Sequence, residues 1–474
     1  GLTPTLSLSY SSSSRNSALG IGWNLNGLPF VSVDTTKGLP QYDGKDKYTF
    51  NGTSILEPQR IKDGSVWKPR VDETADFYIH YYRLKIEASF TRFEKWVRKS
   101  DGQIHWRTRS KDNVLSIYGH DSSGITKIFD PKKSHKVFTW LLEVQYDNLG
   151  NSVQYLYKKE DGNDINAALP YESSRLKHFK EEGFSQRYPY KILYGNTRPS
   201  LADTPNSVDN KWLYEVVFDY GQLENRPYTN TEPQNGREWK SRLDPFSIYT
   251  PGFEIRTYRL CKRILIYHHF DELAAASSLT GIFTCDFNEE STGTTLARVS
   301  YTGVRKDLLT GVYSEKKLPE LSFAYSQPQL GRSFNNVTRN TLANVPEGFN
   351  HPQTRWIDLF GEGIPGILTE SAATWYYKQN CGGGEFGKQS TVIQKPSQNL
   401  GTYALGDFDN DGNLNLFSLQ GRQAGYYEYN RDREQWSGFK PFKSIPQVGH
   451  TKLLDIDADG LADLVVECDD RKAI

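Results

Sequence analysis

The feature that most constrains the fold of this chain is an acidic loop that occurs three times at nearly equal spacing. The two full copies read Asp407-Phe-Asp409-Asn-Asp411-Gly412 and Asp455-Ile-Asp457-Ala-Asp459-Gly460. A degenerate copy begins at Asp358, so successive loops start 49 and 48 residues apart. A fixed period in this range is typical of units that stack or that surround an axis. We therefore expect residues 336–474 to form a domain of repeated units.

The residues around each loop repeat as well. An apolar residue lies two positions before each first aspartate, and an aliphatic residue lies nine positions after it. These pairs are Trp356 and Ile367, Leu405 and Leu416, and Leu453 and Leu464. Aromatic clusters follow the first two loops at 375–377 and 426–429. Such a recurrence is typical of propeller blades, so we expect the loops at 358, 407 and 455 to belong to the first blades of a β-propeller.

The composition of the two full loops suits a hard cation. Carboxylates stand at positions 1, 3 and 5, glycine at position 6, and Asn415 or Asp463 at position 9. Carboxylate and amide oxygens at this spacing can surround Ca²⁺. The alternative is an acidic turn without metal. For the degenerate copy we expect such a plain turn, because Phe360 cannot ligate a cation.

Residues 1–335 have a different pattern of short aromatic and β-branched runs separated by turn residues such as Asp43-Gly44 and Asp101-Gly102. This pattern predicts an all-β, mostly antiparallel and curved sheet. The glycines from Gly20 to Gly27 are expected to bend the chain, with Trp23 as an anchor in the core.

Charge and hydropathy limit the partners and location of the protein. Lys+Arg and Asp+Glu both number 57, so the chain as a whole has no electrostatic preference for nucleic acid or an anionic membrane. No apolar run reaches the length of about 20 residues that spans a bilayer, and residues 1–30 do not have the pattern of a signal peptide. The four cysteines have neither zinc nor disulfide spacing and are expected to be buried thiols.

Two other stretches are weak candidates for chemistry. Residues 382–388 fit GxxxxGK, but Gln389 stands where a P-loop has Ser or Thr, and we expect a loop of a blade. His268 and His269 are adjacent, and neighbouring side chains of a strand point to opposite faces, so they are not expected to ligate one metal together. With no catalytic motif found, the sequence predicts a protein that is not an enzyme.

The repeat loops resemble the FG-GAP/VCBS repeats of integrin-type β-propellers, in which calcium has a structural role. On that resemblance, each loop would supply four side chains and the main-chain carbonyl of position 7. The implied ligands are Asp407, Asp409, Asp411, Asn413 and Asn415 in one loop, and Asp455, Asp457, Asp459, Leu461 and Asp463 in the other.

Longer blocks resemble the B component of bacterial insecticidal toxin complexes, whose N-terminal region also occurs in the Salmonella virulence protein SpvB. These blocks are residues 2–28, 105–161, 244–260, 267–270 and 356–377, and the segment from Tyr146 to Tyr157 matches the RHS pattern. The resemblance implies that residues 1–335 are the first segment of an RHS-type β-shell. The ADP-ribosyltransferase activity of SpvB would belong to a separate C-terminal domain.

The same resemblance implies the function and the partners. The shell would be completed by a toxin C component and would enclose a toxic payload, while the propeller would dock on a pore-forming A component. The protein would act outside the producing cell, as part of a secreted toxin complex, without inserting into a membrane itself. The acidic loops alone would equally support a calcium-dependent adhesion or glycan-binding propeller, and residues 1–335 favour the toxin complex.

Overall fold

The chain forms two compact units. The computed structural model describes residues 1–36, 38–173, 175, 183–200, 211–221, 239–270, 278–307, 310, 312–326, 336–337, 339–345, 351–361, 363–372, 374–401, 403–409, 411–419, 424–431, 433–443, 450–454, 462–468 and 471–473. Unit 1 comprises Gly1–Asp34 and Pro40–Tyr325, and unit 2 comprises Thr35–Leu39 and Ser326–Ile474. The expected boundary after residue 335 lies at the end of a segment outside the described residues, so it stays a prediction.

The predicted all-β fold class is confirmed. Within the described part, helical residues are confined to 170–173 and 175. All pairings between the named strands are antiparallel. The described residues contain no helix that is both long enough and apolar enough to cross a membrane.

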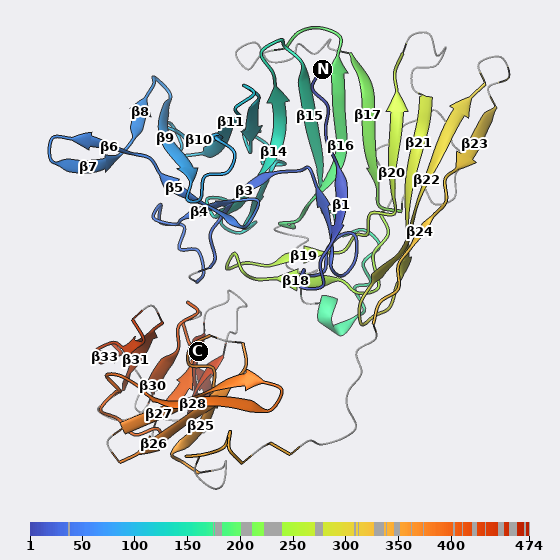
Figure 1. The fold of residues 1–474 in the computed structure, drawn as a ribbon. Coiled ribbons are helices and arrows are strands. Elements are labelled where there is room, and N and C mark those ends of the chain that lie inside the picture. The colour runs from blue at the N-terminus through green and yellow to red at the C-terminus, as the bar shows by residue number, and fades with distance from the viewer. Residues whose placement is uncertain are drawn as a thin grey trace. The chain divides into compact units, whose positions relative to one another are not determined.

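Eight strands of unit 1 close into a ring, in which the last strand pairs with the first. In ring order they are β3 (Phe30–Val33), β4 (Tyr48–Phe50), β5 (Ser54–Pro58), β9 (Phe77–Leu84), β10 (Arg92–Arg98), β11 (Ile104–Arg109), β12 (Leu115–Tyr118) and β14 (Val137–Tyr146). Two short strands, β8 (Val71–Glu73) and β13 (Lys127–Phe129), pair with β9 and β14. The strands of the ring run from blue to teal in Figure 1.

Aromatic side chains pack together inside this ring. The Trp106 ring lies 5.0 Å from the Tyr48 ring and 6.2 Å from the Trp140 ring, measured between centroids. Trp140 donates its indole N–H to the Ile104 carbonyl at 2.9 Å. Lys95 shares the face of Trp106 across the strand pair, and its ammonium lies 4.9 Å from the centre of the Tyr48 ring. Burial lowers the pKa of Lys95 to about 8, because the charged form loses hydration.

A second, open antiparallel sheet continues from β14 on its other edge. Its strands, green to yellow in Figure 1, follow the order of the chain. They are β15 (Ser152–Lys159), β16 (Arg187–Asn196), β17 (Trp212–Asp219), β20 (Arg263–His268), β21 (Ser278–Asn288), β22 (Thr295–Lys306) and β23 (Tyr313–Lys317), with β24 (Leu321–Ser322) also paired to β22.

The RHS-like segment forms the tight connection between β14 and β15. The carboxylate of Asp147 accepts hydrogen bonds at 2.9 Å from the backbone N–H groups of Leu149 and Asn151, and Gly150 has a φ of +84°. Gly150 and Asn151 thus lie in a tight turn between the two strands.

Three two-stranded sheets complete unit 1. They are β1 (Ser7–Tyr10) with β2 (Trp23–Asn26), β6 (Arg60–Asp63) with β7 (Val66–Pro69), and β18 (Phe246–Ile248) with β19 (Ile255–Thr257). Trp23 is buried, as predicted, and its indole N–H donates to the Tyr325 hydroxyl at 2.7 Å. Trp23 also packs on Phe323, with ring centroids 4.7 Å apart. The first and the last segments of unit 1 are thus held together.

Unit 2 consists of consecutive antiparallel sheets whose strands follow the order of the chain. The first contains β25 (Thr354–Ile357), β26 (Gly366–Ser371), β27 (Thr374–Gly382) and β28 (Glu385–Thr391). The second contains β29 (Ala404–Gly406), β30 (Asn415–Ser418), β31 (Gly425–Asn430), β32 (Gln435–Trp436) and β33 (Lys440–Pro441). The third contains β34 (His450–Leu454), β35 (Asp463–Cys468) and β36 (Arg471–Ala473).

The apolar residues that frame each acidic loop face each other across a hairpin in all three sheets. The cross-strand pairs are Trp356 with Ile367, Leu405 with Leu416, and Leu453 with Leu464. Each acidic loop therefore connects the first two strands of its sheet. The assignment of these sheets to FG-GAP/VCBS propeller blades stays a prediction.

Candidate functional site

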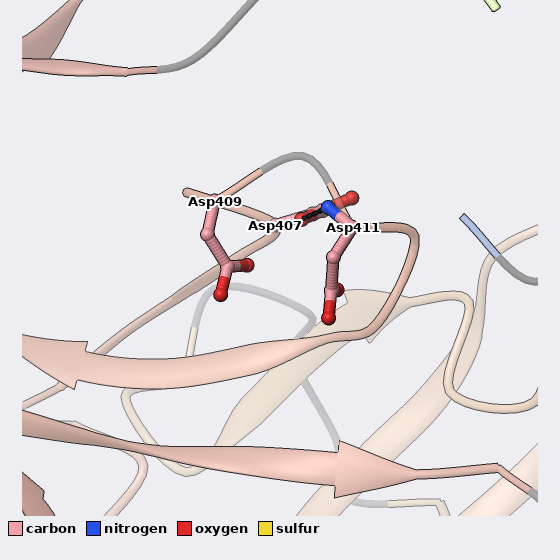
Figure 2. Close-up of side chains that lie close together, drawn as sticks. All are labelled: Asp407, Asp409 and Asp411. Atoms are coloured by element: carbon pink, nitrogen blue, oxygen red, sulfur yellow. Dashed lines mark hydrogen bonds between the residues drawn. The ribbon is translucent and has the colours of Figure 1, made fainter. Parts of the chain in front are cut away.

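The described acidic loop with the strongest metal-ligating geometry connects β29 to β30. Asp407, Asp409 and Asp411 each place a carboxylate oxygen within 4.8 Å of the others. Figure 2 shows the three side chains on one loop, with the carboxyl groups of Asp409 and Asp411 on the same side of it. The alternating spacing brings the three carboxylates together because the loop turns sharply at Gly412, whose φ is +87°.

Backbone hydrogen bonds from within the loop fix the position of Asp407. One carboxylate oxygen of Asp407 accepts from the Asp411 N–H at 3.2 Å, and the other accepts from the Gly412 N–H at 3.0 Å. Asp358 has the same arrangement in the first repeat, where it accepts from Gly361 and Gly363 at 2.8 Å each. The turn thus forms in both repeats, whether or not the other acids are present.

The two asparagines of the proposed ligand set have protein partners. Asn413 donates from its backbone N–H and its side-chain amide to the Asp411 carboxylate, at 2.7 and 3.0 Å. Asn415 is fully buried at the start of β30, and its side-chain oxygen accepts from the Phe408 N–H at 3.1 Å. In this structure the side chain of Asn415 therefore stabilises the conformation of the loop.

The carboxylates of the loop repel one another. Burial, together with the neighbouring charge of Asp411, raises the pKa of Asp407 and raises that of Asp409 to about 6. One carboxylate oxygen of Asp409 is buried and has no hydrogen-bond partner among the described residues. A bound cation would offset the repulsion between the carboxylates and would give the buried oxygen of Asp409 a partner. The donor set therefore fits a hard, oxygen-ligated ion such as Ca²⁺.

The other two loops differ from this one. In the first, Phe360 packs on the Tyr377 ring at 4.8 Å between centroids and takes no polar role, as the sequence suggested. In the third, Asp455, Asp457, Asp459 and Leu461 lie outside the described residues. Asp463 is the first residue of β35. The predicted second metal site therefore stays a prediction.

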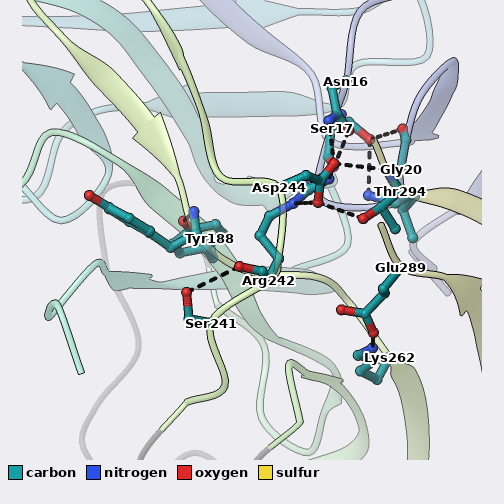
Figure 3. Close-up of polar contacts among 12 residues, drawn as sticks. Asn16, Ser17, Gly20, Tyr188, Ser241, Arg242, Asp244, Lys262, Glu289 and Thr294 are labelled. Carbon is teal, nitrogen blue, oxygen red and sulfur yellow. Dashed lines mark hydrogen bonds and ion pairs between the residues drawn. The ribbon is translucent and has the colours of Figure 1, made fainter. Parts of the chain in front are cut away.

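A second polar cluster was not predicted and lies in unit 1 around Asp244 (Figure 3). Its carboxylate accepts from Arg242 at 2.8 and 2.9 Å, from the Thr294 N–H at 2.8 Å and from the Asn16 amide at 3.0 Å. Arg242 also donates to the Ser17 carbonyl at 2.7 Å. The Asp244 carboxylate thus connects its own segment to two distant ones, at Asn16 and Thr294, and we call this cluster the Asp244 latch.

Other buried charges are paired in the same way. The guanidinium of Arg259 and the carboxylate of Glu160 are both fully buried and form two hydrogen bonds with each other. Glu215 lies 2.8 Å from His269, measured from Oε2 to Nε2. Burial alone would raise the pKa of Glu215, but hydrogen bonds and charge from His269 and Lys191 lower it overall. Glu215 is thus held in its ionised, bonded form.

The weak motifs have the structural roles that the sequence suggested, with one exception. Residues 382–388 form the turn between β27 and β28 and the start of β28. His269 approaches Glu215, whereas His268 packs edge-on against the Tyr214 ring at 5.2 Å. Cys261 and Cys285 are buried thiols, but Cys381 is exposed, so the expectation of burial was wrong there.

Residues 1–270 match the family described as "SpvB: Salmonella virulence plasmid 65kDa B protein". The chain belongs to this SpvB family. It is 30% identical over 301 residues to the protein named mono(ADP-ribosyl)transferase SpvB of Salmonella choleraesuis, which is 61% of this chain and 49% of that protein. The chain thus spans about half the length of this relative.

Solved structures extend the similarity to nearly the whole chain. The N-terminal domain of the effector protein SpvB from Salmonella typhimurium is 28% identical with a TM-score of 0.56, over 64% of this chain and 94% of that one. The Photorhabdus luminescens Tc holotoxin pore is 28% identical with a TM-score of 0.65, over 98% of this chain and 21% of that one. The TcdB2-TccC3 complex, at 22% identity and a TM-score of 0.62 over 98% of this chain and 28% of that one, shares the fold.

The expectation that the protein is not an enzyme is wrong by these comparisons. Its curated relatives from Salmonella choleraesuis and Salmonella typhimurium are named mono(ADP-ribosyl)transferases. The sequence search for catalytic motifs within this chain could not reveal that classification.

We expect the Asp244 latch to stabilise unit 1. In the Asp244→Ala variant, Arg242 would remain buried without its carboxylate, which should lower the free energy of unfolding by about 3–5 kcal/mol. Urea denaturation followed by tryptophan fluorescence measures this. The matched control is Asp286→Ala, which breaks a largely exposed pair with Arg298 and should cost no more than about 1 kcal/mol. Equal losses in the two variants would contradict the latch.

We expect Asp409 to make unit 2 less stable at neutral than at acidic pH when metal is chelated. Because its pKa is raised to about 6 in the folded state, the folded protein binds more protons than the unfolded chain between about pH 4 and 6. The contribution of Asp409 to stability therefore falls as pH rises through this range.

The Asp409→Asn variant should accordingly melt at a higher temperature than the parent at pH 7.5 in chelator and at the same temperature near pH 4. Asp112→Asn, an exposed change in unit 1, serves as the control and should show no such difference. A melting difference for Asp409→Asn that is the same at both pH values would refute the assignment.

Proposed function

We propose that this chain is a structural component of a toxin-delivery complex, in which unit 1 forms part of a β-shell around a toxic payload. The observation that carries the proposal is the similarity to the Tc holotoxin pore, which covers 98% of the chain at 28% identity. This similarity includes unit 2, which the SpvB family match does not reach.

The open edge of unit 1 supports a shell that continues beyond this chain. Strand β23 pairs with β22 on one edge, and no strand among the described residues pairs with its other edge. Unpaired N–H and C=O groups along a strand edge favour the addition of another strand. In this proposal a toxin C component, which carries the payload, supplies strands that complete the shell.

Unit 2 would connect the shell to the pore. We propose that its consecutive sheets are the first blades of a propeller and that this propeller docks on a pore-forming A component. Delivery by such a complex takes place outside the producing cell, so the protein would be secreted with its partners. An adhesion or glycan-binding propeller is the second candidate, but it gives no account of the SpvB-type unit 1.

The assembly can be tested by crosslinking the full-length protein in complex with its C and A components. We expect a capped shell by electron microscopy and crosslinks from the A component to lysines of residues 336–474, such as Lys388 and Lys443. Crosslinks from the A component to residues 1–335 alone would rule out docking through unit 2. Failure to co-purify with the C component would rule out the shared shell.

We further propose that the loop of Asp407, Asp409 and Asp411 binds Ca²⁺ in a structural role. An ion that binds only the folded state raises the melting temperature, so millimolar Ca²⁺ should raise that of the full-length protein relative to chelator. The double variant Asp407→Ala with Asp409→Ala should lose this rise.

The matched control for the calcium test is Asp358→Ala, which alters the first acidic loop but removes no proposed ligand. It should keep the full rise in melting temperature. If Ca²⁺ has no effect on the parent, or if the double variant keeps the rise, the loop is a turn without metal.

A further inference from the structure

Unit 2 contains a groove that the proposed role in a toxin complex does not require. It has a volume of about 960 Å³ and lies between the turn segment 339–345 and one face of the sheet formed by β26, β27 and β28. This volume is within the range of sites that bind small molecules, roughly 300–1,000 Å³. Sheet and turn segment both belong to unit 2, so the groove is complete within that unit.

The floor of the groove contains a buried lysine. Lys378 is 6% exposed, and its ammonium donates to the Ala343 carbonyl at 3.0 Å. An ammonium has three donors, and none of the described lining residues is acidic. A buried cation without a carboxylate is costly, so the site favours a ligand that brings a negative charge.

The position of Lys378 within the repeat is unusual. Lys378 faces Ile367 across the hairpin, just as Tyr427 faces Leu416 in the next repeat. Tyr427 is buried in the apolar core of unit 2. Lys378, by contrast, lies on the sheet face opposite to the core residues Leu368 and Tyr377, where it contacts the turn segment at Ala343.

Apart from the exposed Lys388, the remaining lining is uncharged and combines polar side chains with the apolar Ala343, Val345 and Phe386. Gln389 lies next to Lys378 across the strand pair, and Tyr376 lies between Thr369 and Thr391 in the neighbouring row. Amide and hydroxyl groups both donate and accept hydrogen bonds, as sugar hydroxyls do. The rings of Tyr376 and Phe386 offer apolar faces against which a sugar ring can pack.

From this arrangement we propose that the groove binds an oligosaccharide that carries a carboxylate, with Lys378 as the partner of that carboxylate. The neutral amides and hydroxyls of the lining bind the sugar hydroxyls, and the ammonium selects the acidic sugar. This site is independent of the proposed role in a toxin complex, because it uses only residues of unit 2.

The test compares a neutral sugar with the same sugar extended by an acidic sialic acid residue. Binding of 3′-sialyllactose and of lactose to the full-length protein is measured by isothermal titration calorimetry. We expect sialyllactose to bind at least about ten-fold more tightly, since a charge-assisted hydrogen bond contributes about that factor. Lys378→Met, which keeps most of the side-chain volume, should weaken sialyllactose binding about ten-fold and leave lactose binding unchanged.

Two further variants separate charge from folding. Lys378→Arg keeps the cation and should retain preference for the acidic sugar, whereas Lys111→Met, at an exposed position of unit 1, should change nothing. Equal affinity for the two sugars, undetectable binding of both, or unchanged binding by Lys378→Met would each overturn the proposal. The comparison of sugars on the unaltered protein decides the matter even if a variant fails to fold.

Discussion

Strand β14 is the element on which the architecture of unit 1 depends, because its main-chain groups are shared between two sheets. Along one edge it pairs first with β13 and then with β12, and along the other edge first with β3 and then with β15. A strand has only two edges, so its length of ten residues is what allows four partners. The closed ring and the open sheet thus share one strand, and Trp140 at its middle packs into the ring.

The fold pairs some buried charges with a group of opposite sign and leaves others, such as Lys95 in unit 1, with neutral hydrogen-bond partners. In unit 1, Asp244, Glu160 and Glu215 each have a basic partner close by, so their ionised forms contribute to the fold. In unit 2, one buried oxygen of Asp409 has no hydrogen-bond partner among the described residues, and none of the described residues that line the groove of Lys378 is acidic. Buried charges of this kind gain most from an external ligand, and both proposed sites contain one.

The repeats of unit 2 were the part of the fold that the sequence predicted best, because their determinants are local. The spacing from Trp356 to Ile367, and from Leu405 to Leu416, reflects two strands and one loop, and each pair indeed lies in register. The clustering of Asp407, Asp409 and Asp411 followed from the same local pattern. The hydrogen bond that Asn415 accepts from the Phe408 N–H could not be predicted in this way. The sequence does not determine whether a metal ion or a backbone N–H group contacts the side-chain oxygen of Asn415.

Unit 1 could be predicted only as a class. The partners of Asp244 include Asn16, which lies 228 residues away, and no period in the sequence connects the two. The closure of the ring likewise depends on pairing between β3 and β14, which are separated by most of the ring strands. Such contacts are set by tertiary packing, whereas the alternation of residues within one strand reports only that the strand exists.

The contact between Trp23 and Tyr325 has a consequence for how the protein is made. The two residues are 302 positions apart. A ribosome that adds about 5–20 residues per second therefore exposes Tyr325 roughly 15–60 s or more after Trp23. During this interval the glycine-rich N-terminal bend lacks the contacts with Phe323 and Tyr325 that complete its packing. Unit 1 is consequently a domain that completes its fold only near the end of its own synthesis.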